Sequence, residues 1–243
     1  STEQQIGNQV DRMLDDPRVK HAVRQFHRQW LGLGDFDSVV KDSGKFPDFT
    51  GSMTADWRKS LRTFVVEAYM SEDGDFQQLM TSPTVYLTDQ LAKLYGLPAR
   101  DSGQQSYQLP SDQRAGLITQ PGLMALLANA NQASPIRRGV WIREKLFCQH
   151  IPPPPPNLVT EPPDPDPDAT TRERFKQHTE NDACASCHRL IDPIGLGLSN
   201  YDGVGRFQTR QAGRTIDNSG EVADTRDPAI EGPFNGGPEL SRK

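Results

Sequence analysis

Two proline-rich stretches constrain this chain more than any other feature of its sequence. Residues 152–156 read PPPPP, and residues 161–170 read EPPDPDPDAT. Proline has a fixed φ and no backbone N–H, so neither stretch can form a helix or a central strand. Both stretches favour the extended polyproline II conformation. We therefore expect a stiff, acidic strap over residues 151–168.

Outside the strap, apolar residues recur with the period of amphipathic helices. Helices are expected over residues 1–16, 17–31, 54–70, 88–96, 121–130, 134–147 and 171–181. In the first of them, one stripe holds Ile6, Val10, Met13 and Leu14. Glycine-bounded turns and alternating residues over 205–224 allow a small β-hairpin.

These elements predict a mainly α fold in two helical lobes. Residues 1–105 form a helical domain, and residues 106–243 form a second domain that carries the proline-rich strap at 151–168. A polar stretch over residues 99–113 separates the two lobes. The chain begins without Met and closes with no clear end to an element, so we expect the natural protein to continue beyond it.

Composition argues against several classes of function. The 243 residues carry a formal net charge of −5 with no basic block, which argues against nucleic acid as a partner. No stretch approaches the roughly 20 consecutive apolar residues that a membrane-spanning helix needs. Three cysteines are too few for a disulfide-stapled fold.

Two of the three cysteines lie in the motif Cys184-Ala-Ser-Cys187-His188. C-x-x-C-H is the attachment signature of c-type haem. Its two thiols bond to two vinyl groups of the porphyrin, and the histidine that follows becomes the proximal iron ligand. The sequence therefore predicts one covalent haem c, held in the second domain by Cys184, Cys187 and His188.

Two other readings of the motif remain open. Structural zinc would take Cys184 and Cys187 with Cys148 and one histidine, yet zinc cysteine pairs usually come with a second matching pair, and the sequence has none. The histidines available are His150, His178 and His188. A thioredoxin-like redox pair normally follows a strand, whereas the segment before the motif reads as a helix. Both alternatives are weaker than haem.

The residues around the iron follow less directly from the sequence. No Met, His or Cys follows His188, so a sixth iron ligand within this chain must lie upstream. The candidates are Met124, Cys148, His150 and His178, and a five-coordinate iron is the alternative. We expect a carbonyl near Pro193 to accept the Nδ1 proton of His188. The arginines that could pair with haem propionates are Arg137, Arg138, Arg172 and Arg174, and we favour Arg138.

Several segments together resemble a known family. "RAGLITQ", "SPIRRG", "PPPPP", "CASCH", "IDPIG" and "YDGVGRF" occur here in the order found in planctomycete-type secreted multidomain c-type cytochrome proteins, which contain domain-of-unknown-function families 1592 and 1588. The similarity covers most of residues 5 to 210. Where the family reads "GFALENFD", this chain has "GLGLSNYD", which replaces an acidic residue by Ser199.

The resemblance implies a periplasmic or extracellular protein of several domains, often beside carbohydrate-binding modules, with no well-established reaction. With the haem motif, it predicts electron transfer outside the cytoplasm, in a chain that can serve polysaccharide oxidation. The partner would be a redox protein or a neighbouring haem domain, with any polysaccharide contacted through other domains. The alternatives are a peroxidase-like haem enzyme with an open distal site and a structural zinc module.

Overall fold

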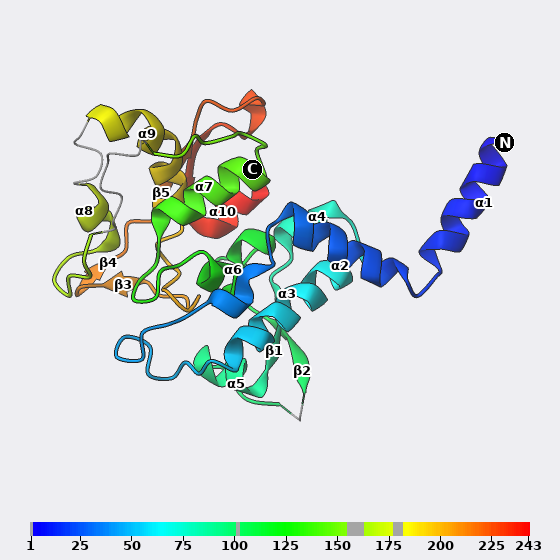
Figure 1. The fold of residues 1–243 in the computed structure, drawn as a ribbon, viewed down its shortest axis with the longest axis horizontal. Coiled ribbons are helices and arrows are strands. Elements are labelled where there is room, and N and C mark those ends of the chain that lie inside the picture. The colour runs from blue at the N-terminus through cyan, green and yellow to red at the C-terminus, as the bar shows by residue number, and fades with distance from the viewer. Residues whose placement is uncertain (1, 101–102, 155–162, 177–181) are drawn as a thin grey trace.

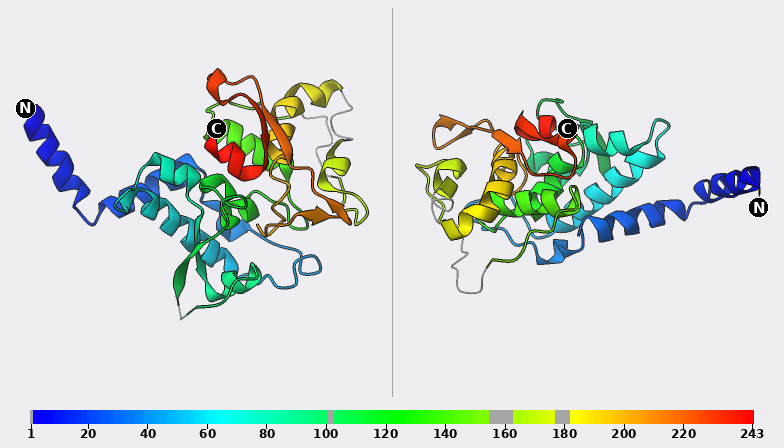
Figure 2. Two further views of the ribbon diagram at one scale, coloured as in Figure 1. Left: turned by 180° about the vertical axis from the view of Figure 1, so that it is seen from behind. Right: turned by 90° about the horizontal axis from the view of Figure 1, so that it is seen from above.

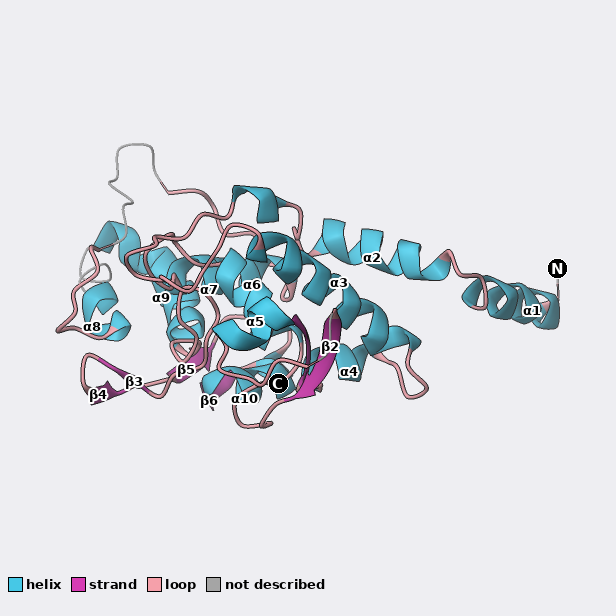
Figure 3. Ribbon diagram, turned by 90° about the horizontal axis from the view of Figure 1, so that it is seen from below, coloured by secondary structure: helices cyan, strands magenta, loops and turns pink. Residues whose placement is uncertain are grey.

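The computed structural model describes residues 2–100, 103–154, 163–176 and 182–243, and helices dominate them (Figure 1). Within these ranges the strands form three separate two-stranded sheets, each antiparallel and small (Figure 3). The prediction of a mainly α fold is confirmed.

The N-terminal helices extend away from the body of the molecule (Figures 1 and 2). Helix α1 (Glu3–Leu14) begins with a capping box between Thr2 and Gln5, and it buries none of its residues. Helix α2 (Val19–Trp30) follows and reaches the body through the buried His27. The helix predicted over residues 1–16 is thus confirmed as α1, but the four residues of its apolar stripe are between 48% and 61% exposed.

The central part of the first lobe is built around one long helix, α3 (Met53–Met70), whose buried face includes Trp57, Leu61 and Phe64. The elements around it are η1 (Asp35–Ser38), α4 (Phe76–Thr81), β1 (Thr84–Thr88), α5 (Asp89–Leu94) and β2 (Gln104–Gln108). Strand β2 lies in the stretch expected to be a polar linker. It forms because Tyr107 pairs with Val85 of β1 and is buried, whereas its other residues are too polar to predict a strand.

The second half combines short helices with two small sheets. Its helices are η2 (Leu117–Thr119), α6 (Pro121–Leu126), α7 (Pro135–Lys145), α8 (Thr171–Lys176), α9 (Asp182–Leu196), η4 (Pro228–Ile230) and α10 (Gly236–Arg242). Its strands are β3 (Arg210–Gln211), β4 (Arg214–Thr215), β5 (Ser219–Val222) and β6 (Gly232–Asn235). The β3–β4 pair is the predicted hairpin, closed by Ala212 and Gly213 at φ 50° and 71°.

The proline-rich region is described only at its two ends. Residues 151–154 and 163–166 are neither helix nor strand, and residues 155–162 lie outside the described chain. The later end is fastened to the body by side chains. Gln132 donates to the Pro163 carbonyl at 2.7 Å, and the buried Arg174 donates to the Ala169 carbonyl at 2.7 Å and to Gln132 at 3.0 Å.

One apolar core joins the two expected lobes. It runs from Leu31 to Leu240 without a break between the halves. A polar contact crosses between them as well, because Trp57 donates to the Tyr95 hydroxyl at 2.6 Å, and that hydroxyl donates to the Val204 carbonyl at 3.1 Å. The boundary at residues 105 and 106 falls inside β2, and the division into two domains stays a prediction.

Helices α7 and α9 cross at glycines. A Cβ on Gly139 of α7 would lie 2.1 Å from the Ile191 carbonyl oxygen of α9. A Cβ on Gly195 of α9 would lie 1.9 Å from the Pro135 carbonyl oxygen of α7. Each helix thus meets the other's backbone directly, and only residues without a side chain allow this approach.

A buried arginine reinforces the same crossing. Arg138 of α7 is fully buried and donates to the carbonyls of Leu198, Tyr201 and Asp202 at 2.8 to 3.0 Å. It also donates to the Met124 carbonyl at 3.3 Å. Burial lowers its pKa to about 10. The expectation that Arg138 pairs with a haem propionate is therefore wrong, because its guanidinium is enclosed and bonded to backbone.

Lys41 is another deeply buried cation beside α6. Its Nζ donates to the carbonyls of Ala125 at 2.8 Å and Asn129 at 3.1 Å, and only 7% of the residue is exposed. Burial, with a smaller effect from the nearby Arg138, lowers its pKa to about 7.

In the described residues no helix is both long and apolar enough to cross a membrane.

We predict that Gly139→Ala destabilises the protein by about 1–3 kcal/mol, because the added methyl group forces α7 and α9 apart. Urea unfolding followed by circular dichroism measures the change. Gly7→Ala is the matched control, since Gly7 lies in α1 with no atom within 4 Å of the added Cβ. An unchanged unfolding midpoint for Gly139→Ala would show that the helices do not meet at this glycine.

We also predict that stability rises with pH between about 7 and 10 through Lys41. In this window the unfolded lysine holds a proton that the folded one has lost, so the slope is positive, at most about 1.4 kcal/mol per pH unit. Lys41→Met removes this contribution, which urea unfolding at pH 7, 8 and 9 measures. Lys45→Met, on the same loop but exposed, should keep the wild-type slope.

Candidate functional site

One stripe of α9 lines an open pocket of about 550 Å³. The stripe consists of Ala185, His188, Arg189, Asp192, Pro193 and Leu196, which recur at the helical spacing of three and four residues. The opposite side of α9 packs on α7 through the buried Ile191 and Ile194. The sequence of α9 thus divides it into a core face and a pocket face, and His188 lies on the pocket face.

His188 is held by a carboxylate of its own helix. Its Nδ1 lies 3.0 Å from Oδ2 and 3.1 Å from Oδ1 of Asp192, one helical turn later. The side chain of Asp192 is 5% exposed and that of His188 is 18% exposed. With Asp192 ionised, Nδ1 is the donor of this hydrogen bond, and the lone pair of the neutral ring is then on Nε2.

The pair changes the acidity of the histidine. The hydrogen bond to Asp192 raises the pKa of His188 above its ordinary value, against the opposing effect of burial. We expected the Nδ1 acceptor to be a carbonyl near Pro193. It is instead the carboxylate of Asp192, because the four-residue spacing places these two side chains side by side on the helix.

The other walls of the pocket come from β5 and α8. Strand β5 contributes Ser219, Gly220 and Glu221, and α8 contributes Arg172. Gly220 allows close approach to α9, since a Cβ there would lie 2.6 Å from the Pro193 carbonyl oxygen. Arg172 is fixed at the rim by an ion pair with Asp217 at 3.1 Å.

Arg143 of α7 joins these two walls from behind. It is buried, and it donates to the Leu190 carbonyl of α9 at 2.9 Å and to the Ala223 carbonyl after β5 at 2.6 Å. It also donates to the Gln149 side chain at 2.7 Å. A single side chain therefore fixes α9 relative to the end of β5, and with it the width of the pocket.

The predicted attachment residues lie in the first two turns of α9. The backbone of Cys184, Cys187 and His188 is helical, and a spacing of three and four residues places them on one side of the helix. Cys187 is half-exposed and lies one residue before His188. The side chain of Cys184 is outside the described part of the structure.

None of the described distal-ligand candidates lines this pocket. Met124 is 1% exposed within the apolar core, on α6. Cys148 is exposed, with a φ of 52°, on the loop after α7. His150, on the same loop, lies 3.9 Å from Glu144 with 80% of its side chain exposed. His178 lies outside the described residues.

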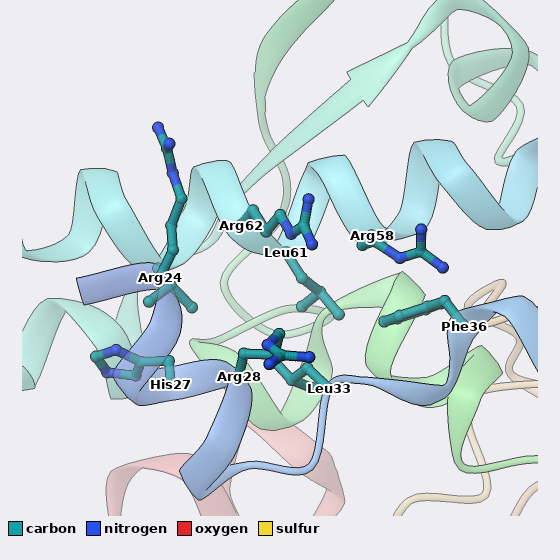
Figure 4. Close-up of a pocket in the computed structure, with 9 residues that line it drawn as sticks. Arg24, His27, Arg28, Leu33, Phe36, Arg58, Leu61 and Arg62 are labelled. Carbon is teal, nitrogen blue, oxygen red and sulfur yellow. The ribbon is translucent and has the colours of Figure 1, made fainter. Parts of the chain in front are cut away.

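A second hollow lies between α2 and α3, rimmed by arginines (Figure 4). Arg24 and Arg28 come from α2, and Arg58 and Arg62 come from α3. Its space of about 10 Å³ is close to the minimum for one water molecule. Arg58 is already paired with Asp37. The larger pocket beside His188 is therefore the better candidate for a functional site.

Among the side chains that the structure describes, no three potential metal ligands gather in one place. Cys148 lies on the exposed loop after α7, whereas Cys187 and His188 are on α9. The zinc reading would need Cys184 and further ligands beside these. The described residues thus offer His188 as a single imidazole ligand rather than as part of a preformed multi-ligand metal site.

Sequence reasoning missed Asp192 as a partner of His188. The signal was present in the spacing His-x-x-x-Asp, since residues four apart meet on a helix. It was missed because no helix was expected over residues 182–196. In fact α9 continues through Pro193 to Leu196, and the Gly197 N–H donates to the Pro193 carbonyl at 3.2 Å.

Two family models match the chain, one in each half. Residues 1–97 match PSD4, a protein of unknown function (DUF1592), and residues 114–211 match PSCyt3, a protein of unknown function (DUF1588). These are the two families named by the resemblance, and their names imply cytochrome-like domains of planctomycetes. A search of curated proteins and one of solved structures find no match.

Proposed function

Because residues 1–97 belong to the PSD4 family and residues 114–211 to the PSCyt3 family, we propose that this chain is a c-type cytochrome module that transfers electrons outside the cytoplasm. Cys184 and Cys187 bind the haem covalently, and His188 is its proximal ligand. Bound haem supplies one-electron exchange between the ferric and ferrous states. The location follows from the chemistry, since haem c is attached in the periplasm or beyond.

The observation that carries the proposal is His188 and its carboxylate at the wall of a pocket. A histidine that ligates a metal almost always donates its other ring N–H to a carboxylate, carbonyl or water. His188 has this arrangement, with Asp192 at 3.0 Å from Nδ1. The motif C-x-x-C-H independently assigns the same histidine to iron.

The pocket also suits the size and chemistry of a haem. Its volume of about 550 Å³ is within the range of about 300–1,000 Å³ that is typical of cofactor sites. Ala185, Pro193 and Leu196 supply apolar surface on α9. Arg172 lies at the rim, where a guanidinium can pair with a propionate carboxylate. The arginines that line the pocket are Arg172 and Arg189, and these two are the candidates for this role.

The remaining residues of the module act as supports. Arg143 and the α7–α9 crossing hold His188 and the β5 wall at a fixed separation, which keeps reorganisation small when the charge on iron changes. The redox partner would be another protein or a neighbouring haem domain. Polysaccharide oxidation is the process that this electron transfer would serve, with any carbohydrate bound by other domains.

A second candidate function is a haem enzyme with an open distal site. It is favoured by one observation: Met124, Cys148 and His150 do not line the pocket beside His188. A five-coordinate iron would then be free to bind a small ligand such as peroxide. Addition of cyanide distinguishes the two functions, because the spectrum of a six-coordinate electron carrier resists it and that of an open site shifts.

We predict that the protein, produced with working haem-attachment machinery, keeps its Soret absorption after acid-acetone extraction. Replacing both Cys184 and Cys187 by Ala should abolish the retained absorption, because no thioether can form. Cys148→Ala is the matched control and should retain the full absorption. A colourless wild-type protein that contains zinc would overturn the haem assignment and support the structural zinc module.

A further inference from the structure

The carboxylate of Asp192 does more at this site than hold the ring of His188 in place. It is an anionic acceptor, and it is nearly enclosed, with 4% of the residue exposed. Both of its carboxylate oxygens lie within 3.1 Å of the same nitrogen of His188. Within the described residues, no cation forms an ion pair with this carboxylate other than the His188 ring itself.

An anionic acceptor acts on the ring more strongly than a neutral one. A carboxylate draws the Nδ1 proton toward itself and raises the electron density at Nε2, so the imidazole becomes a more basic ligand. Hydrogen bonds to a charged partner are roughly twice as strong as those between neutral groups. The limited exposure of the pair keeps this interaction from being screened by water.

From this geometry we infer that Asp192 is a positioning residue that gives His188 imidazolate character and lowers the reduction potential of the haem. A more basic ligand and a nearby negative charge both stabilise the ferric state over the ferrous state. The two effects have the same sign, so they add. The inference rests on the proposed function, and it assigns the module to the low-potential, electron-donating end of its chain.

The arrangement is also rigid, which a tuning residue requires. Ile191 precedes Asp192 and is locked against Gly139 of α7, and Pro193 follows it and contacts Gly220 of β5. The carboxylate therefore has little freedom to rotate toward solvent. A bond of this kind persists through the redox cycle instead of forming in one state only.

The test compares the haem-loaded wild-type protein with Asp192→Asn, which keeps the shape of the side chain and removes its charge. Spectroelectrochemical titration should show the ferric-to-ferrous equilibrium displaced toward ferrous iron by at least tenfold, which is about 59 mV for one electron. The matched control is Glu72→Gln, which removes an exposed carboxylate of the loop after α3, outside the residues that line the pocket. A shift as large in the control would overturn the specific role of Asp192.

A spectroscopic measurement separates tuning from mere structural support. The iron–histidine stretching band, read by resonance Raman on the photolysed carbon monoxide adduct, should move to lower frequency in Asp192→Asn. If Asp192→Asn attaches no haem, the frequency of the iron–histidine band in the wild-type protein alone tests the inference. A frequency matching haem–imidazolate model complexes supports the inference, and one matching neutral imidazole complexes refutes it.

Failure of the inference and failure of the proposed function look different. Loss of the haem assignment would leave the wild-type protein colourless after acid-acetone extraction. A protein that retains haem, but shows the same potential and the same iron–histidine band with Asp192 or Asn at this position, keeps the proposed function and rejects the role of Asp192.

Discussion

The direct contact between the backbones of α7 and α9 is the constraint on which the second half of this molecule depends. Gly139 and Gly195 allow the two helices to touch. Arg138 and Arg143 of α7 then donate hydrogen bonds to backbone carbonyls of α9 and of the loop that follows it. Each carbonyl left unsatisfied in the interior would cost about 1–3 kcal/mol. The crossing therefore fixes α9, and α9 in turn presents His188.

Buried arginines join separate segments of the chain in this molecule. Arg138 is surrounded chiefly by backbone carbonyls, so its charge is solvated by dipoles rather than neutralised by a carboxylate. Such a site can bond several chain segments at once because the guanidinium has five N–H donors. This explains why "SPIRRG" is part of a motif without touching the pocket: its second arginine organises the loop after α9.

Local patterns in the sequence predicted several of the helices and the β3–β4 hairpin, although not α9. They failed where the deciding contact is distant along the chain. Strand β2 depends on pairing of Tyr107 with Val85, and the burial of Arg138 depends on a loop some 60 residues later. Asp192 was missed for a different reason: no helix was expected over residues 182–196, although α9 spans them with Pro193 inside.

The pairing of His188 with Asp192 within one helix has a consequence for the order of assembly. A ligand and its acceptor that come from one turn need no tertiary structure to find each other. Helical turns form in under about a microsecond, far ahead of an apolar core that spans both halves of the chain. A newly made chain would thus hold His188 already oriented, with Asp192 beside it, before the rest of the fold forms.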